Sequence, residues 1–492
     1  MLTNLRSPVF RQCVLVFILS VLVKLLTINT VLYKSTDFEV HRNWLAITYS
    51  LPFREWYKES RNIWTLDYPP FFAYFEYALS IVAQFFDPQM LSVDNIDYES
   101  YGTVLFQRLS VICISDLVLG LCVILAVPRT NSVKALILTL FSSSLFIVDH
   151  IHFQYNGMML GLLILSAVLI EENRFLLGAF TYMFLVFFKH IYLYAAPVYF
   201  VYCLGRFVVG KSDGFANLAK LATVVIATTA AAVVPLIVSD QLGAAIGRMF
   251  PFGRGLVHSY WAPNLWALYL FGDRVLGKFF SPSSQGVSST RGLVQVTDNA
   301  VLWNVTPGMT FGLTLAVYLV FLRFVWLAAR QRKISLLTLV AYGNAICFFF
   351  GWHIHEKAIL MITLPLIVQT MRDDKNREYV WMLAFLSCMS LLPLLPLAQE
   401  TVLKWTLAAT GAVIDCIILD PRSTKRGVMI CFIGAAVLPE VFRVFVHGVF
   451  MKESKFEFLP LMITSVVHAV MLGWLLVWSF REAVTGVHKE KR

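Results

Sequence analysis

The densest group of reactive side chains in this 492-residue sequence follows its first apolar run. The segment STDFEVHRNW begins at Ser35 and holds two carboxylates, Asp37 and Glu39, beside the guanidinium of Arg42. One carboxylate could take a proton from a hydroxyl nucleophile while a cation stabilises a phosphate leaving group. The same residues also suit a capped helix start with acids in the first turn. Spacing alone leaves both carboxylates open as the base.

A second polar segment, WTLDYPP, ends in two prolines. Because each proline restricts its own backbone and the preceding residue, the pair predicts a stiff turn that starts a helix near Phe71. Asp67 and Tyr68 lie just before this turn. We predict that these two side chains face a sugar.

Two H-x-H motifs, His150/His152 and His353/His355, could indicate a metal. Side chains two apart on a helix diverge, however, and no further ligand cluster is evident. We therefore predict no metal and no cofactor. The imidazoles would instead hydrogen-bond sugar hydroxyls.

Cations near the second H-x-H motif suit phosphate. Lys357, next to Glu356, is predicted to bind substrate phosphate together with Lys189 or Arg254. The other interpretation of such residues is an interfacial lysine whose charged end reaches water. Both interpretations stay open for Lys357.

The segment HSYWAPNLW mixes aromatic rings with polar groups, as carbohydrate sites do. Tyr260, Trp261 and Asn264 are its candidate substrate-binding residues. An interfacial belt of aromatic residues would explain Trp266 equally well.

Composition identifies the elements that must position these groups. The chain is 58% hydrophobic and 14% charged, against roughly 25% charged in soluble domains, so it is predicted to be a polytopic, all-helical membrane protein. About fourteen apolar windows suit transmembrane helices. They lie near residues 10–33, 103–127, 133–148, 156–171, 174–188, 190–208, 216–238, 305–329, 335–351, 356–370, 379–397, 401–419, 427–447 and 459–480. Eight scattered cysteines predict neither a disulfide framework nor a metal site.

Lys and Arg residues are concentrated in every second short loop between the apolar windows. The net charge of +10 therefore indicates how the chain is oriented in the membrane and does not indicate nucleic-acid binding. Both termini are predicted to be cytoplasmic. Two long loops, 34–102 and 239–304, are predicted on the lumenal face, opposite the basic loops. The first is expected to contain interfacial helices. Within the second, the Ser281–Arg291 stretch is expected to be flexible. Asn304 opens a glycosylation sequon weakened by Pro307. Glu440 and Arg443 read as a helix ion pair.

The polar segments recur together in a recognisable order across residues 34–370. They are TDFEVHRNW, WTLDYPPFFAYFEY, VDHIHFQYNG, FKHIYLYAAP, HSYWAPNLWALY and FGWHIHEKAIL. This set resembles the dolichyl-phosphate-glucose-dependent α-1,3-glucosyltransferases of N-linked glycosylation in the endoplasmic reticulum membrane. The sequences of these segments are more similar to those of the family members that add the second glucose, to Glc1Man9GlcNAc2 diphosphodolichol.

The resemblance implies a glycosyltransferase class C fold, inversion at the anomeric carbon and a lumenal site that uses no metal. It also implies that Asp37, the acid opening the first lumenal loop, is the catalytic base. The HIHEK motif would lie near the active site, and Glu356 in this motif is expected to bind substrate, as are Glu39 and Arg42. We expect residues 1–370 to form the catalytic membrane module and residues 371–492 to add further transmembrane helices of the same unit.

Three alternatives remain open at this stage. Two are a first-glucose enzyme acting on Man9GlcNAc2 diphosphodolichol and a mannosyltransferase of the same superfamily. The third, a lipid or sugar transporter, would place ionisable residues near the middle of broken helices, whereas here they sit at the ends of apolar runs.

Overall fold

The computed structural model describes residues 7–250, 252–258, 261–280, 299–421, 426–450 and 458–489. Within these ranges the chain is helical, as predicted. Strand-like pairing there is limited to two isolated bridges, Val257 with Ile354 and Trp261 with His355. All eight cysteines are free thiols, which confirms the absence of a disulfide framework.

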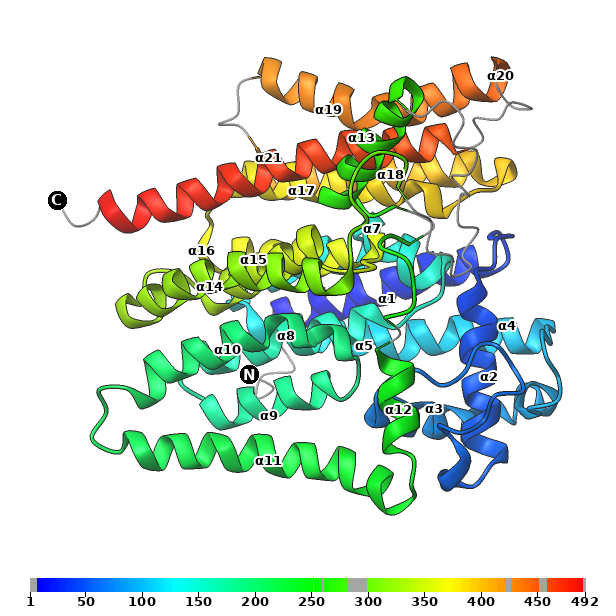
Figure 1. The fold of residues 1–492 in the computed structure, drawn as a ribbon, viewed down its shortest axis with the longest axis horizontal. Helices are drawn as coiled ribbons and strands as arrows, with labels where there is room; N and C mark the ends of the chain where they lie inside the picture. The colour runs from blue at the N-terminus through cyan, green and yellow to red at the C-terminus, as the bar shows by residue number, and fades with distance from the viewer. Residues whose placement is uncertain are drawn as a thin grey trace. The chain divides into compact units, whose positions relative to one another are not determined.

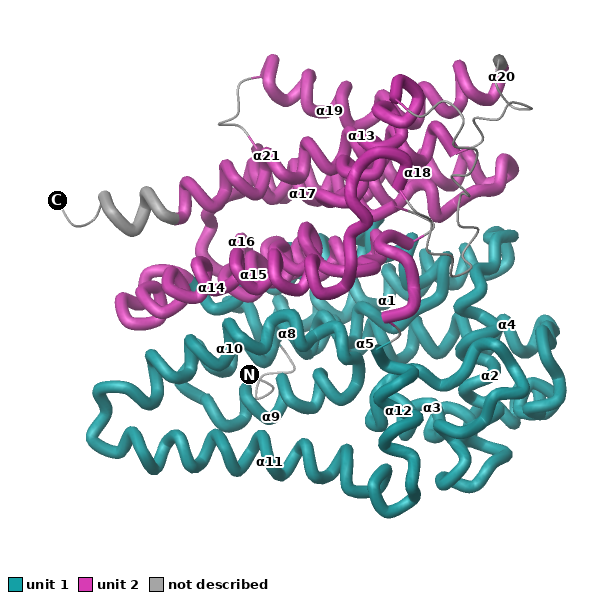
Figure 2. The backbone as a smooth tube through the Cα atoms, viewed as in Figure 1, with its two compact units in different colours: residues 1–251, 335–337 teal, residues 252–334, 338–492 magenta. Residues whose placement is uncertain are grey.

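The chain divides into two compact units (Figure 2). Unit 1 holds residues 1–251 and 335–337, and unit 2 holds residues 252–334 and 338–492. The segments around Asp37 and His152 therefore belong to unit 1, and the HIHEK motif belongs to unit 2. The expected catalytic module, residues 1–370, is a functional division and stays a prediction.

Unit 1 is built from α-helices joined by short 3-10 and π segments, and Figure 1 labels its longer helices. The helices are α1 Pro8–Ile28, α2 Thr36–Ser50, α3 Pro70–Ala83, α4 Tyr101–Ser110, α5 Asp116–Ala126, α6 Ser132–Leu140, α7 Ser143–Leu145, α8 Asn156–Glu171, α9 Phe175–Val186, α10 Ala196–Cys203, α11 Gly214–Val238 and α12 Leu242–Met249. The intervening segments are η1 Phe53–Glu55, η2 Pro88–Leu91, η3 Val111–Ser115, η4 Arg129–Asn131, η5 Phe146–Ile151, η6 His190–Ala195 and η7 Leu204–Val208. Helix α8 packs between α5 and α9, α9 lies beside α11, and α2 packs on α3.

Unit 2 is organised around α17 and α21. Its helices are α13 Leu265–Phe280, α14 Pro307–Gln331, α15 Leu336–Phe350, α16 Leu360–Asp373, α17 Arg377–Leu391, α18 Thr401–Leu419, α19 Arg426–Val441, α20 Gly448–Phe450 and α21 Leu459–Lys489. Short segments η8 Glu356–Ile359, η9 Leu392–Leu394, η10 Ala398–Glu400 and η11 Phe442–His447 lie between them. Helix α17 packs against α16, α18 and α21, and α21 also contacts α13 and α19.

Among the described residues, nine helical stretches are long and apolar enough to cross a membrane. They are Pro8–Ile28, Tyr101–Ala126, Arg129–Ile151, His190–Val208, Gly214–Val238, Pro307–Gln331, Ala398–Leu419, Arg426–His447 and Leu459–Ala483. This confirms a polytopic membrane protein. The other five predicted windows coincide with the shorter helices α8, α9, α15, α16 and α17.

The two long loops are partly helical. Loop 34–102 contains α2, which follows the N-cap Ser35, and α3, which begins at Pro70 beside the predicted turn. Loop 239–304 contains α12 and α13, and the predicted flexible stretch Ser281–Arg291 lies outside the described residues. Three backbone N–H groups at residues 300–302 donate to the Asp273 carboxylate and so tie the end of this loop to α13.

Candidate active site

The start of α2 lies against the joint between η5 and α8 in unit 1. Ser35 caps α2, because its hydroxyl accepts the Asp37 backbone N–H at 3.2 Å and donates to the His152 carbonyl. Beside it, the rings of Phe38 and Phe153 stack with centroids 4.7 Å apart. Two segments more than a hundred residues apart in sequence thus meet at Asp37. The cap confirms the predicted helix start.

The Asp37 carboxylate is oriented by side chains from the facing joint. Gln154 Nε2 donates to Asp37 Oδ2 at 2.7 Å, and His152 Nε2 lies 3.4 Å from the same oxygen. The Asp37 side chain keeps 19% of its surface exposed. Asp37 is thus both held in one orientation and accessible, and its role as the catalytic base stays a prediction.

A chain of amides links Gln154 to a cation. Asn156 Nδ2 donates to Gln154 Oε1 at 2.7 Å, and Lys189 Nζ donates to Asn156 Oδ1 at 3.3 Å. The same ammonium lies 5.0 Å from the centroid of the Tyr68 ring, within cation–π range. Burial raises the pKa of the Tyr68 phenol well above its ordinary value, so this ring stays neutral. Lys189 is thereby held in the same polar network as the Asp37 carboxylate.

Glu39, the second carboxylate of this segment, is bound to Arg42. Arg42 Nε and Nη2 donate to the two Glu39 oxygens at 2.7 and 2.8 Å, and Asn62 Nδ2 donates to Glu39 Oε1 at 2.7 Å. Arg42 is 1% exposed and also donates to the Met90 and Ser92 carbonyls. This bidentate pair ties α2 to the η2 loop. The substrate-binding roles expected for Glu39 and Arg42 stay predictions.

Asp67 and Tyr68 lie where the loop returns toward α3. The Tyr57 hydroxyl donates to the Tyr68 carbonyl at 2.7 Å, which fixes the residue before the prolines. Arg248 of α12 interacts electrostatically with Asp67 and donates to the Glu59 carbonyl at 2.7 Å. Asp67 and Tyr68 thus belong to the same unit as Asp37. So does Arg248, a cation that the sequence motifs did not single out.

His150 and His152 point to different partners, as their spacing predicted. His150 is buried, with Nε2 3.3 Å from Asp116 Oδ1, and the other Asp116 oxygen accepts from Lys24 at 2.8 Å. The neighbouring Asp149 carboxylate accepts the backbone N–H groups of residues 156 and 157 at the start of α8. His152, but not His150, contacts Asp37.

In unit 2 the HIHEK segment lies along the chain that precedes α13. Val257 pairs with Ile354, and the His353 N–H donates to the Leu256 carbonyl at 2.9 Å. His353 Nδ1 also lies 2.7 Å from the Gly255 carbonyl. The segment therefore turns at residues 352–353, with a positive φ of 52° at His353, and continues into the bridged residues 354–355, so it is not the helical pair assumed from the sequence.

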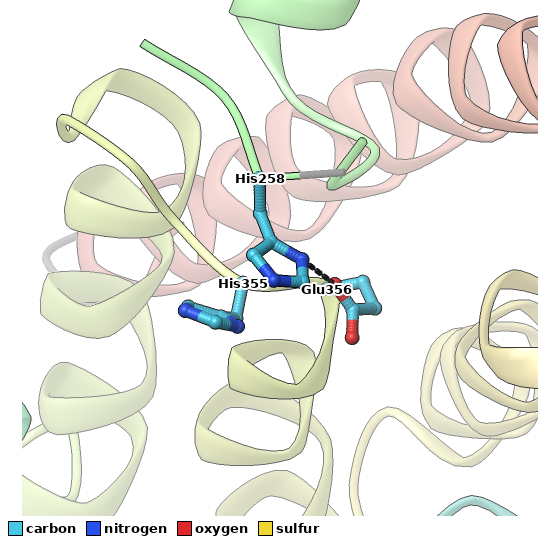
Figure 3. Close-up of side chains that lie close together, drawn as sticks. All are labelled: His258, His355 and Glu356. Atoms are coloured by element: carbon cyan, nitrogen blue, oxygen red, sulfur yellow. Dashed lines mark ion pairs between the residues drawn. The ribbon is translucent and has the colours of Figure 1, made fainter. Parts of the chain in front are cut away.

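Figure 3 shows that His258, which the motifs did not single out, completes a cluster with His355 and Glu356. The two imidazole rings lie with centroids 4.0 Å apart, and His258 Nδ1 is 3.5 Å from Glu356 Oε2. One potential ligand atom from each residue lies within 4.8 Å of the others. The expectation that no further ligand group approaches the H-x-H motif was therefore wrong, because His258 arrives from a distant segment. The metal-free reaction stays a prediction.

The electrostatics of the HIHEK segment favour neutral imidazoles at His353 and His355. Burial, reinforced by the charges of Lys357 and Arg254, lowers the pKa of His355 well below its ordinary value. Burial also lowers the pKa of His353 to about 4. Burial alone would raise the Glu356 pKa, but the contact with His258 and the charge of Lys357 bring it below its ordinary value. Arg254 and Lys357 thus both act on the HIHEK segment, and their role in binding the substrate phosphate stays a prediction.

The residues of the aromatic segment before α13 mainly make contacts that hold this part of the chain in place. Asn264 is 1% exposed; its oxygen accepts the Trp266 N–H and its nitrogen donates to the Phe348 carbonyl. Trp261 is 8% exposed. The guanidinium carbon of Arg274 lies over its indole ring, 4.8 Å from the ring centroid. Tyr260 lies outside the described residues. The substrate roles expected for all three stay predictions.

Comparison with known proteins identifies the family of this chain. A family model described as the ALG6, ALG8 glycosyltransferase family matches residues 16–479. A Schizosaccharomyces pombe protein named dolichyl pyrophosphate Glc1Man9GlcNAc2 alpha-1,3-glucosyltransferase is 43% identical, over 91% of this chain and 93% of its own. Proteins with the same name from Arabidopsis thaliana and Mus musculus are 38% and 39% identical, over 95% and 96% of this chain and 97% and 96% of their own.

Proposed function

Because the chain belongs to the ALG6, ALG8 glycosyltransferase family, we propose that it moves glucose from dolichyl phosphate glucose to the terminal glucose of Glc1Man9GlcNAc2 diphosphodolichol. The new linkage is α-1,3. The relatives named for that acceptor cover more than nine tenths of this chain, which supports the second-glucose reaction over the first. In this proposal the protein resides in the endoplasmic reticulum membrane, with about fourteen transmembrane helices, a lumenal site and cytoplasmic termini.

The observation that carries the mechanism is the contrast between the two acids of α2. Asp37 is oriented by Gln154 and partly exposed, whereas the Glu39 oxygens are engaged by Arg42 and Asn62. Asp37 is therefore assigned as the base, and Glu39 as the residue that holds Arg42 in place.

The chemistry then needs one proton transfer and one displacement. Asp37 takes the proton from the 3-hydroxyl of the acceptor's terminal glucose, and that oxygen attacks the anomeric carbon of the donor. The bond from this carbon to the phosphate oxygen breaks, and its electrons leave with dolichyl phosphate. Attack opposite the phosphate converts a β-linked donor into an α-linked product. Because the phosphate leaves as an anion, no second carboxylate is needed to protonate it.

Cations in each unit can stabilise that phosphate. Lys189, held by Asn156 beside Tyr68, is one candidate, and Arg254 and Lys357 beside the HIHEK segment are the others. Positive charge preset near a leaving phosphate lowers the barrier without reorganisation during the reaction. Lysine and arginine differ in geometry, so a Lys189→Arg variant should not fully replace lysine.

Lipid-linked oligosaccharides from cells that lack this protein test the proposal. Loss of the second-glucose enzyme leaves Glc1Man9GlcNAc2 diphosphodolichol to accumulate, and the wild-type chain should clear it. The Asp37→Asn chain should not, although it is made at the same level. Accumulation of the unglucosylated form would assign the first-glucose reaction instead, and an unchanged lipid profile would contradict both.

A further inference from the structure

A small pocket in unit 2 brings the HIHEK segment together with the C-terminal helices. Its lining comes from η8, α17, η9, α21 and the chain before α13. The lining residues are Trp261, Pro263, Glu356, Ser390, Pro393, Leu394, Leu461, Thr464, Ser465 and His468. The family resemblance rested on residues 34–370, yet seven of these ten residues come from the chain after residue 370.

Glu356 supplies unused hydrogen-bond acceptors to this pocket. The residue is 2% exposed, and neither carboxylate oxygen receives a hydrogen bond from any described residue. The His258 imidazole stands 3.5 Å away from Oε2, at the edge of hydrogen-bonding range. A buried ionised carboxylate without donors is costly, so such a group indicates a missing partner.

His468 on α21 adds a second unused acceptor. This residue is 1% exposed, and its Nε2 lies 2.9 Å from the Ala436 carbonyl. A carbonyl only accepts, so Nε2 carries the proton and Nδ1 of the neutral ring is an acceptor. Nδ1 has no hydrogen-bond partner among the described residues.

The three hydroxyl groups that line the pocket each donate a hydrogen bond to a backbone carbonyl. Ser390 donates to the Ser387 carbonyl at 2.9 Å, Thr464 to the Pro460 carbonyl at 2.8 Å, and Ser465 to the Trp261 carbonyl at 2.7 Å. Each hydroxyl oxygen can still accept. Apart from the indole N–H of Trp261, the polar side chains that line the pocket therefore offer acceptors and keep no proton to donate.

We infer that this pocket binds a hydroxyl group at the edge of a neutral hexose, with Glu356 or His468 accepting its proton. The cavity volume of about 10 Å³ admits a group of about that size and not the sugar ring itself. An anion such as phosphate would lie against the Glu356 carboxylate and is disfavoured. The inference rests on the proposed glucosyl transfer, which supplies two such sugars, the donor glucose and the terminal glucose of the acceptor.

Glu356→Gln tests the pocket with little change in shape, because one acceptor oxygen becomes a donor. In full-length protein reconstituted in vesicles, we expect the KM for one of the two glucose-bearing lipids to rise by at least about tenfold, with kcat nearly unchanged. His468→Phe, which removes Nδ1, should raise the same KM. A rise in the donor KM assigns the pocket to the donor glucose, and a rise in the acceptor KM assigns it to the acceptor. Glu378→Gln in α17 is the matched control and should leave both constants unchanged.

Deoxyglucose analogues of the affected lipid sharpen the test. Removal of the hydroxyl that Glu356 accepts should weaken binding to wild type by about tenfold and leave binding to Glu356→Gln unchanged. Unaltered KM values in both variants, while wild type transfers glucose, would overturn the pocket assignment and leave the proposed function standing. Inhibition of wild type by a chelator, reversed by zinc, would assign these groups to a cation and also overturn it.

If wild type transfers no glucose, the proposed function fails. The pocket is then judged by thermal stabilisation with dolichyl phosphate glucose and with the monoglucosylated lipid. A shift with one of them in wild type that is lost in Glu356→Gln would support sugar binding. Equal shifts in both proteins, or none in wild type, would contradict it.

Discussion

Two carboxylates, Asp37 in unit 1 and Glu356 in unit 2, each lie beside an imidazole, but their surroundings differ. Asp37 receives a 2.7 Å hydrogen bond from Gln154 and keeps 19% of its side chain exposed. The Glu356 side chain is 3% exposed and has acceptors that no described donor uses. The first environment orients an accessible base. The second leaves a buried acceptor that a ligand's hydroxyl group can satisfy, so residue type alone does not set the role of a carboxylate.

Among the residues that surround these two carboxylates, the largest effect is expected at Gln154, which orients Asp37. Gln154→Leu should lower kcat by about 10- to 100-fold with little change in KM, because a mispositioned base loses part of a contribution that is about 10²- to 10⁴-fold when intact. Steady-state kinetics in vesicles measure both constants. Gln84→Leu in unit 1, outside this cluster, is the control.

Gln154→Glu separates positioning from a merely structural role. A carboxylate placed beside Asp37 disfavours its charge and raises its pKa. The acidic limb of the kcat–pH profile should therefore move to higher pH. A lower kcat with an unmoved profile would mean that Gln154 supports the fold and not the ionisation of Asp37.

Glu39→Gln should act on stability and not on chemistry. The substitution removes the counter-charge of Arg42, a buried guanidinium, and should cost about 2 kcal/mol of folding free energy. Thermal unfolding in detergent measures the loss as a lower Tm. The kcat of the folded fraction should stay within a few-fold of wild type. A collapse of kcat at unchanged Tm would exchange the roles of Glu39 and Asp37.

A further effect is a pH dependence of stability set by two imidazoles of unit 2. The unfolded chain binds a proton at His353 near the ordinary pKa of 6.5, whereas the folded protein, where burial lowers the pKa, binds it only near pH 4. The unfolded state thus holds more protons between these values, and stability should fall as pH decreases from 6.5 to 4. His355, whose pKa is also lowered by burial, adds to this trend.

His353→Asn tests that contribution with a small backbone penalty. Asparagine tolerates the positive φ of 52° at this position, so the loop should keep its shape. Between pH 6.5 and 4 the Tm of the variant should fall less than that of wild type. Parallel curves for the two proteins would contradict the assignment of a depressed pKa to His353.

Local features of the fold were predictable from sequence because they depend on neighbouring residues. All fourteen apolar windows coincide with helices, Ser35 caps α2, and Pro70 begins α3. The divergence of His150 and His152 also followed from their spacing. The predicted ion pair of Glu440 with Arg443 forms, and Lys404 joins it at 2.6 Å.

Contacts between distant segments were not predictable in the same way. Nothing in the local pattern indicates that residues 255–258 run along residues 353–355, so His258 was missed, although it stands in a quoted motif. Gln154 and Asn156 were also in a quoted motif, but amides gave no chemical signal of their own. His468 follows Thr464 and Ser465 by four and three residues, so these three polar residues share one face of α21, and this local signal could have identified the face that meets the pocket.

In this mechanism Asp37 performs the proton transfer while Glu356 holds a substrate. Single-turnover glucose transfer at saturating donor and acceptor, with Asp37→Asn and Glu356→Gln compared in the same vesicles, separates these two roles. The rate should fall at least about 100-fold for Asp37→Asn, with donor binding retained, and should stay within about threefold of wild type for Glu356→Gln. A near-normal rate for Asp37→Asn would show that another group takes the proton.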